Sequence, residues 1–115
     1  CDISKDEDLA ALTQALEGET LHTVVHSIAF AGPDELSRPF IETSRAGYNL
    51  ALDVSAYSLV AVARAVAPRM ADGGSLMTLT YLGSTRVIPN YNVMGVAKAA
   101  LEACVRYLAH NLGPR

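Results

Sequence analysis

The chain has 115 residues, half of which are hydrophobic, and its formal net charge is −3 at pH 7. This length accommodates one domain of ordinary size, or part of a larger one, with enough apolar material for a buried core. The negative charge and the lack of a lysine and arginine cluster argue against nucleic acid or an anionic membrane as a partner.

The cysteines, the hydropathy and the two ends of the chain indicate the compartment of the protein, whether it spans a membrane and whether the chain is a fragment. Cys1 and Cys104 lie in no CxxC pattern and near no histidine at metal-ligand spacing, which favours a reducing compartment. No apolar run approaches the roughly 18–20 residues that span a bilayer, and no signal-peptide pattern opens the chain. The chain begins without a methionine and ends on Gly-Pro-Arg just after a helical pattern, so we expect a fragment of a longer protein.

The first part of the chain predicts a helix followed by a buried strand. Ser4 and Glu7 have the spacing of a capping box, and leucines recur at helical spacing after them, so a helix is expected over about residues 5–17. The short β-branched run at 22–28 predicts a buried strand, and the small residues at 29–33 predict a loop.

A long helical region comes next. We expect it to begin at a cap at residue 43 or 44 and to end near Ala67, where a proline follows, with an interruption near 53–55. The segment 56–63 is apolar almost all the way round. A helix of this kind is buried on more than one side, here by a sheet and by another subunit.

The last third of the chain predicts a turn at 72–75, a second buried strand at 76–80, a loop from Tyr81 to Asn90 and a final helix at about 91–112. The resulting order of elements is α-β-α-β-α. Alternation of this kind predicts a parallel sheet with right-handed crossovers in a doubly wound α/β fold.

Tyr91 and Lys98 lie seven residues apart at the start of the final predicted helix. At about 3.6 residues per turn both side chains would project from one face, with Lys98 reaching back toward the phenol. An ammonium beside a phenol favours the phenolate, so we expect a lowered pKa for Tyr91 and a proton donor usable at neutral pH. On spacing alone, the commoner explanation is an amphipathic helix with a half-buried tyrosine and a snorkelling lysine.

Ligands bind outside the carboxyl ends of the strands in sheets of this type. The small-residue loop 29–31 follows the first predicted strand, and Tyr81 follows the second. The helix that carries Tyr91 and Lys98 begins at the same edge. We therefore expect these residues to converge on one rim of the sheet.

Other reactive residue types predict no site. His22 and His26 are accompanied by no carboxylate or cysteine at metal-ligand spacing, so no metal is expected. No serine lies in a GxSxG context, which argues against nucleophilic catalysis.

Four segments, in this order, resemble the bacterial enoyl-[acyl-carrier-protein] reductases of the NADH type, within the short-chain dehydrogenase/reductase superfamily. They are 26–31 (HSIAFA), 53–58 (DVSAYS), 79–83 (LTYLG) and 89–98 (PNYNVMGVAK). The Tyr-x6-Lys separation is specific, because ordinary members of the superfamily have Tyr-x3-Lys. The loop after the first strand also lacks their Asn-Asn-Ala-Gly. The resemblance extends over essentially the whole chain.

The resemblance implies a Rossmann-like doubly wound parallel sheet, with residues 1–115 forming the central part of a single NAD(P)-binding domain. The first βαβ unit and the C-terminal segment of the family would lie outside the chain. It also implies a cytoplasmic homotetramer that reduces the trans-2 double bond of enoyl-acyl-carrier-protein thioesters with NADH in fatty acid elongation. NADPH is not excluded, because the selecting residue lies outside these residues. We expect the 115 residues alone to be inactive.

The resemblance also assigns roles to residues. Tyr91 matches the tyrosine that hydrogen-bonds the thioester carbonyl and stabilises the enolate, Lys98 the lysine that holds the nicotinamide ribose, and Tyr81 a second active-site tyrosine near the acyl chain. The implied cofactor contacts, besides Lys98, are Asp2, Ile3, Ser27, Ile28 and Ala29. The implied substrate contacts, besides the two tyrosines, are Ala31 and Met94.

From the residues alone, plainer explanations stay open. Tyr81 could be an interface tyrosine at a strand end, Asp2 a helix-entry residue and Met94 a core residue. A carbonyl or β-ketoacyl reductase of the same superfamily is one alternative function. A non-catalytic α/β module that assembles through the apolar helix at 56–67 is another. In every case the helices at 44–67 and 91–112 are expected to make subunit contacts.

Overall fold

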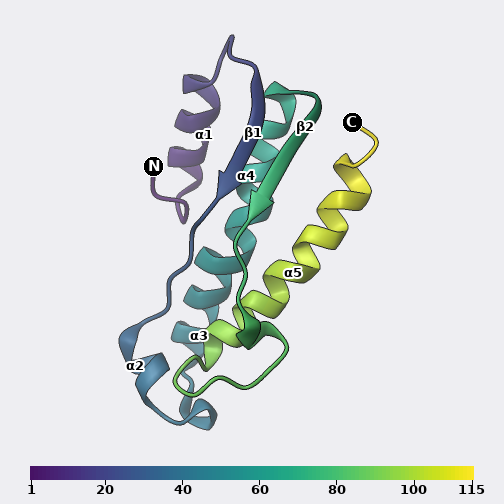
Figure 1. Cartoon of the computed structure of the whole chain (residues 1–115). Coiled ribbons are helices and arrows are strands. Elements are labelled where there is room, and N and C mark those ends of the chain that lie inside the picture. The colour runs from purple at the N-terminus through teal and green to yellow at the C-terminus, as the bar shows by residue number, and fades with distance from the viewer.

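A two-stranded parallel sheet carries the fold (Figure 1). The computed structural model describes residues 1–115. Strand β1 spans Leu21–His26 and strand β2 spans Met70–Thr78, and their last paired residues are His26 and Thr78. Since the strands are parallel, the segments that follow β1 and β2 leave the sheet at the same edge, as the order of elements predicts.

The chain also forms five α-helices, and their bounds follow. They are α1 (Asp6–Ala15), α2 (Pro33–Ser37), α3 (Arg45–Leu52), α4 (Ser58–Val66) and α5 (Val93–Leu112). A π-helical turn (Asp53–Tyr57) joins α3 to α4, and 3₁₀ turns lie at Phe40–Glu42, Ala67–Arg69 and Leu82–Ser84. The sequence predicts the larger elements but misses α2 and the short turn after it, which lie between the expected loop at 29–33 and the expected helix cap at 43 or 44.

Helix α4 is the central helix of the fold. It contacts both strands as well as α1 and α5, and Figure 1 shows it running behind the sheet. Seven of its nine residues are buried, which confirms the expectation that an apolar segment of this kind is covered on more than one side. The side chains of Ala56, Leu59 and Leu101 form a buried cluster between α5 on one side and α4 with the π-helical turn before it on the other.

The α3–α4 region also confirms the expected interruption, which takes the form of the π-helical turn. Helix α3, the π-helical turn, α4 and the 3₁₀ turn after α4 form one continuous helical stretch, Arg45–Arg69, of 25 residues. An 18-residue window within it has a mean hydropathy of 1.6. By length and composition this stretch could cross a membrane, so the expectation that no run approaches that length is wrong. More than half of the window, 56%, is buried inside the molecule, as in a core helix.

The predicted capping box at the start of α1 is wrong. The Ser4 hydroxyl donates to the Asp2 carboxylate at 2.7 Å, and the Ser4 backbone N–H donates to the same oxygen at 3.0 Å. This local turn uses the serine before the helix begins, and the N-cap, Lys5, makes no side-chain cap.

The predicted turn at 72–75 lies inside the bounds of β2, as a bulge. Leu21 pairs with Met70, whereas Thr23 pairs with Ser75, so the intervening residues of β2 bulge out of the ladder. Gly73 adopts a φ of 75°, which glycine tolerates best. The second strand therefore begins at Met70 instead of 76 and ends at Thr78 instead of 80.

His26 is a buried polar residue that joins three elements. Its Nε2 lies 2.8 Å from the Ser58 hydroxyl, and its Nδ1 lies 2.8 Å from the Thr78 hydroxyl. The Ser58 hydroxyl donates to the Val54 carbonyl, so in the neutral ring Nε2 donates to Ser58 and Nδ1 accepts from Thr78. The imidazole thereby links β1, β2 and α4 just below the rim.

Acid should destabilise the protein through His26. Burial lowers the folded-state pKa of His26 below its ordinary value of 6.5, with the Lys98 charge as a smaller cause. Between the folded and unfolded pKa values the unfolded state binds more protons, so the free energy of unfolding falls as the pH drops below 6.5. We expect His26→Gln to weaken this pH dependence, measured by urea unfolding between about pH 7.5 and about pH 5.5.

His22→Gln is the matched control, because His22 is exposed on the same strand. The control should keep the pH dependence of the parent protein. An equal slope in the parent and the His26 variant would contradict this account.

Candidate active site

The predicted site residues gather at the carboxyl edge of the sheet. Lys98, on α5, donates from its ammonium to the Leu79 carbonyl at 2.8 Å, directly after the end of β2. Tyr81 follows two residues later, and its ring meets the ring of Tyr91 edge to face at a centroid distance of 4.8 Å and an interplanar angle of 63°. The expected convergence of Tyr81, Tyr91 and Lys98 is therefore present in the structure.

Tyr91 lies between two tight turns and outside the helix. The Tyr91 N–H donates to the Ile88 carbonyl at 3.1 Å, and the Tyr91 carbonyl accepts from the Met94 N–H at 2.9 Å. Asn90 and Asn92, on either side, have φ values of 63° and 45°. Helix α5 begins only at Val93, so the expectation that Tyr91 and Lys98 project from one helical face is wrong.

The electrostatics of the phenol also differ from expectation. Burial raises the pKa of Tyr91 above 10.0, and the neighbouring Tyr81 raises it further. The predicted lowering by Lys98 is therefore wrong for this arrangement, because that ammonium is directed to the Leu79 carbonyl. The consequence is a phenol that stays protonated, and able to donate, throughout the neutral range.

Lys98 has the free donors that a cofactor hydroxyl needs. The residue is only 7% exposed, and burial lowers its pKa below 10.5. An ammonium has three N–H donors, of which one is used by Leu79. Two donors of a nearly buried cation are left at the carboxyl edge of the sheet, which suits a pair of ribose hydroxyls. The donors of Lys98 therefore fit the ribose contact that the resemblance implies for this residue.

A serine holds the loop that follows β1. The Phe30 N–H donates to the Ser55 hydroxyl oxygen at 2.9 Å, and that hydroxyl donates to the Phe30 carbonyl at 3.0 Å. Ser55 is fully buried in the π-helical turn, and the sulfur of Met94 lies 3.6 Å from its oxygen. Through Ser55, the loop that contains Ala29 and Ala31 is linked to α5. The predicted cofactor contact at Ala29 and the predicted substrate contact at Ala31 are therefore held by the same serine.

The remaining predicted cofactor residues lie at the start of the chain and after β1. Asp2 and Ile3 precede α1, which runs antiparallel to β1, so they lie toward the carboxyl end of that strand (Figure 1). The Asp2 carboxylate is engaged with Ser4 and lies 3.6 Å from the Lys5 ammonium. Ser27 and Ile28 directly follow the last residue of β1.

Sequence reasoning missed several residues that support this edge. Glu102 accepts hydrogen bonds from the hydroxyls of Thr80 at 2.7 Å and Ser84 at 2.5 Å, which fixes the loop after β2 to α5 and lowers the pKa of Glu102. Gly83 lies against the Tyr91 ring, where a Cβ would overlap Cδ2 and lie 2.8 Å from Cε2. The only signal for Gly83 in the sequence is its place two residues after Tyr81, in a segment that carries the family resemblance.

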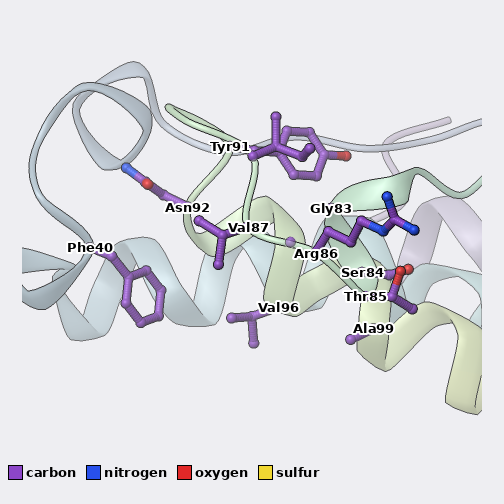
Figure 2. Close-up of a pocket in the computed structure, with 12 residues that line it drawn as sticks. Phe40, Gly83, Ser84, Thr85, Arg86, Val87, Tyr91, Asn92, Val96 and Ala99 are labelled. Atoms are coloured by element: carbon purple, nitrogen blue, oxygen red, sulfur yellow. The ribbon is translucent and has the colours of Figure 1, made fainter.

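A cavity of about 490 Å³ adjoins the turn that carries Tyr91 (Figure 2). Its wall combines Phe40, the loop 83–88 and one side of α5, including Val96 and Ala99. Figure 2 shows Tyr91 at its edge, but neither Tyr81 nor Lys98 lines it. The cavity therefore borders the candidate site without containing the predicted cofactor residues.

Comparison with known proteins gives one consistent result. A family model described as Enoyl-(Acyl carrier protein) reductase matches residues 1–115. The chain belongs to this family. It is 54% identical over 115 residues to the enoyl-[acyl-carrier-protein] reductase [NADH] FabI of Bacillus cereus and 49% identical to that of Nostoc, in each case over 98% of this chain and 45% of the relative.

The fold agrees equally well with solved enoyl reductase structures. A Bacillus cereus enoyl-acyl carrier protein reductase with NADP+ and indole naphthyridinone matches 99% of this chain with a TM-score of 0.95 and 53% identity. The Aquifex aeolicus enoyl-[acyl-carrier-protein] reductase (NADH) matches 99% with a TM-score of 0.96 and 47% identity. The chain covers 45% and 46% of those two chains. The Rossmann-like α/β fold implied by the resemblance is thereby confirmed.

Ser55→Ala should destabilise the protein. The substitution removes the fully buried hydroxyl that pairs with both the Phe30 N–H and the Phe30 carbonyl in part-buried hydrogen bonds, so we expect the free energy of unfolding to fall by about 1–3 kcal/mol, measured by urea unfolding. Ser37→Ala, at an exposed site where the hydroxyl makes one 3.3 Å bond, is the control and should change it by less than about 0.5 kcal/mol. Equal effects of the two variants would contradict this role of Ser55.

Gly83→Ala should displace the Tyr91 ring, because the added Cβ overlaps it. We expect a changed near-ultraviolet circular dichroism of the tyrosines and a lower urea midpoint. Gly32→Ala is the control, since a Cβ at Gly32 meets only Cγ of Glu35 at 3.9 Å. A tyrosine spectrum unchanged by Gly83→Ala would show that the ring does not depend on this contact.

Proposed function

We propose that the complete protein carrying this chain reduces the trans-2 double bond of enoyl-acyl-carrier-protein thioesters with NADH, in fatty acid elongation. The observation that carries the proposal is the contact of the Tyr81 and Tyr91 rings at the carboxyl edge of the sheet, where the Lys98 ammonium binds the carbonyl of Leu79, two residues before Tyr81. Membership of the enoyl reductase family, and identity of 54% to a relative named for NADH, support it.

The cofactor contacts that we propose lie along one edge. Two free N–H donors of Lys98 would hold the nicotinamide ribose hydroxyls, and the backbone of Ser27, Ile28 and Ala29 would lie along the cofactor. Asp2 and Ile3 would lie beside the adenine ring. When bound, NADH supplies a hydride to the β-carbon of the substrate.

The role that we propose for Tyr91 is to donate a hydrogen bond to the thioester carbonyl. As hydride adds to the β-carbon, negative charge grows on that carbonyl oxygen, and a positioned donor stabilises the resulting enolate. The raised pKa of Tyr91 supports this role, because the phenol keeps its proton at neutral pH. Burial lowers the pKa of Lys98 below 10.5, so as the pH rises this ammonium loses its charge at a lower pH than an exposed lysine does.

The substrate contacts that we propose surround the two phenols. Tyr81 would lie near the acyl chain, with Met94 lining the pocket and the Ala31 backbone at the thioester. Support comes from the packing of the two rings at 4.8 Å and from the link between Met94 and the Phe30 loop through Ser55. The small side chain of Ala31 allows the close approach to the backbone that this role needs.

We further propose that residues 1–115 are part of a single NAD(P)-binding Rossmann domain. The paired residues Val25 and Met77 are 58% and 49% exposed on the sheet face away from α4, so this face has room for further segments. We also propose a cytoplasmic homotetramer, with α3–α4 and α5 as the subunit contacts. Support for this assembly is the family relationship and the apolar length of the α3–α4 region.

The decisive experiment is an NADH-oxidation assay on the complete protein with crotonyl thioester, repeated with a β-ketoacyl thioester and with NADPH. Turnover of the enoyl thioester alone supports the proposal. Turnover of the β-ketoacyl thioester alone would identify a ketoreductase, and no turnover of either would favour an assembly module. We expect the 115 residues alone to give no turnover.

Tyr91→Phe should reduce kcat and kcat/KM together by roughly 100-fold, because it removes a donor that acts mainly in the transition state. The KM for NADH should change little. Tyr107→Phe is the matched control, because Tyr107 is 76% exposed on α5 and should keep full turnover. A Tyr91 variant with unchanged kcat would overturn the assigned role.

A further inference from the structure

Asn92 has an unusual backbone conformation, and its side-chain amide lies within hydrogen-bonding distance of three backbone carbonyls. Its φ and ψ are 45° and −121°, a conformation that L side chains rarely adopt and glycine adopts easily. It occupies the first central position of the turn closed by the Tyr91 carbonyl and the Met94 N–H, with the geometry of a type II′ turn. A side chain at such a position costs stability, so something else must favour asparagine here.

The amide of Asn92 supplies that compensation. Its nitrogen lies 2.8 Å from the Arg38 carbonyl and 3.2 Å from the Glu35 carbonyl, with the Leu36 carbonyl at 3.4 Å. Figure 2 shows this side chain directed away from the Tyr91 ring and toward the blue-grey ribbon. The partners lie at the carboxyl end of α2, where helical carbonyls lack intrahelical partners.

The segment that Asn92 holds is itself fixed at its other side. The Glu35 carboxylate accepts from the Ser44 N–H at 3.1 Å and from the Ser44 hydroxyl at 2.5 Å, at the start of α3. A Cβ at Gly47 would overlap that carboxylate. The segment 33–38, which continues the loop beyond Ala31, is therefore held between α3 and the Tyr91 turn.

We propose that Asn92 is a positioning residue that couples the place of the Tyr91 phenol to the order of the segment 33–38. The amide holds this segment while the positive φ of the same residue sets the direction in which the chain leaves Tyr91. Loss of the amide frees the segment 33–38 and removes the restraint that this segment places on the Tyr91 turn. This inference rests on the proposed role of Tyr91 as the donor to the thioester carbonyl.

Asn92→Gly separates the two functions of this residue. Glycine accepts the positive φ without strain, so the turn can still form, but the link to the Arg38 and Glu35 carbonyls is lost. We expect kcat for crotonyl thioester to fall by roughly tenfold to a hundredfold, since a small misplacement of a catalytic group has effects of that size. The KM for NADH should stay within about twofold, and amide hydrogen exchange in 33–38 should become faster.

Asn90→Gly is the matched control on the other side of Tyr91. Asn90 also has a positive φ, but it is exposed and its amide makes no hydrogen bond to the rest of the chain. This variant should keep kcat and the exchange rates of the parent. Asn92→Asp, which keeps the size but turns a carboxylate toward three carbonyls, should lose turnover at least as strongly as Asn92→Gly.

The outcomes distinguish this inference from the proposed function. If the parent protein reduces crotonyl thioester and Asn92→Gly keeps its kcat, the positioning role is overturned and the proposed function stands. Equal losses in Asn90→Gly and Asn92→Gly would also overturn it, because turn mobility alone would then be the cause. A lowered kcat without faster exchange in 33–38 would overturn the coupling. A parent protein without enoyl reductase turnover would overturn the proposed function itself.

Discussion

The parallel pairing that ends at His26 and Thr78 is the constraint on which the rest of the structure depends. It makes two chain segments leave the sheet side by side, one into the Phe30 loop and the other toward Tyr81. The buried imidazole of His26 joins this last pair to α4 through two hydroxyls, so the edge is fixed in three directions. An apolar residue at this position could fill the same space, but it could not hold the hydroxyl of Thr78 at the point where the chain turns away from the sheet.

Polar groups of modest size complete the site inside an otherwise apolar helical region. Ser55 and Ser58 are both fully buried. Ser55 forms hydrogen bonds with the loop after β1, and Ser58 forms one with His26. A hydroxyl is small enough to fit between packed helices, and these two supply partners for the Phe30 backbone and for the buried imidazole of His26. The π-helical turn, Asp53–Tyr57, contains Ser55 and lies directly beside Ser58, so the irregular helix and the polar contacts occur at the same place.

The sequence predicts the order of elements, the parallel sheet and the common rim, because these follow from hydrophobic periodicity and from strand direction. It also predicts which tyrosines and which lysine lie together. It does not predict that Tyr91 precedes the helix, since the conformation of Asn92 depends on contacts with Glu35, 57 positions earlier. The direction of the Tyr91 pKa shift fails for a similar reason: the partner of the Lys98 ammonium is a backbone carbonyl, which residue types cannot reveal.

The glycines beside the tyrosine pair set a limit on how this site can vary. Gly83 leaves room for the Tyr91 ring, and Gly95 leaves room for the carbonyl of Gly83, which would lie 2.7 Å from a Cβ on α5. The Tyr91 ring packs on the backbone of Gly83, and Gly83 packs on the backbone of Gly95 in α5. A side chain added at either glycine would displace its neighbour. The ligand contacts proposed for Ala29 and Ala31 lie outside this packing, so we expect substitutions there to change ligand preference without displacing the Tyr91 ring.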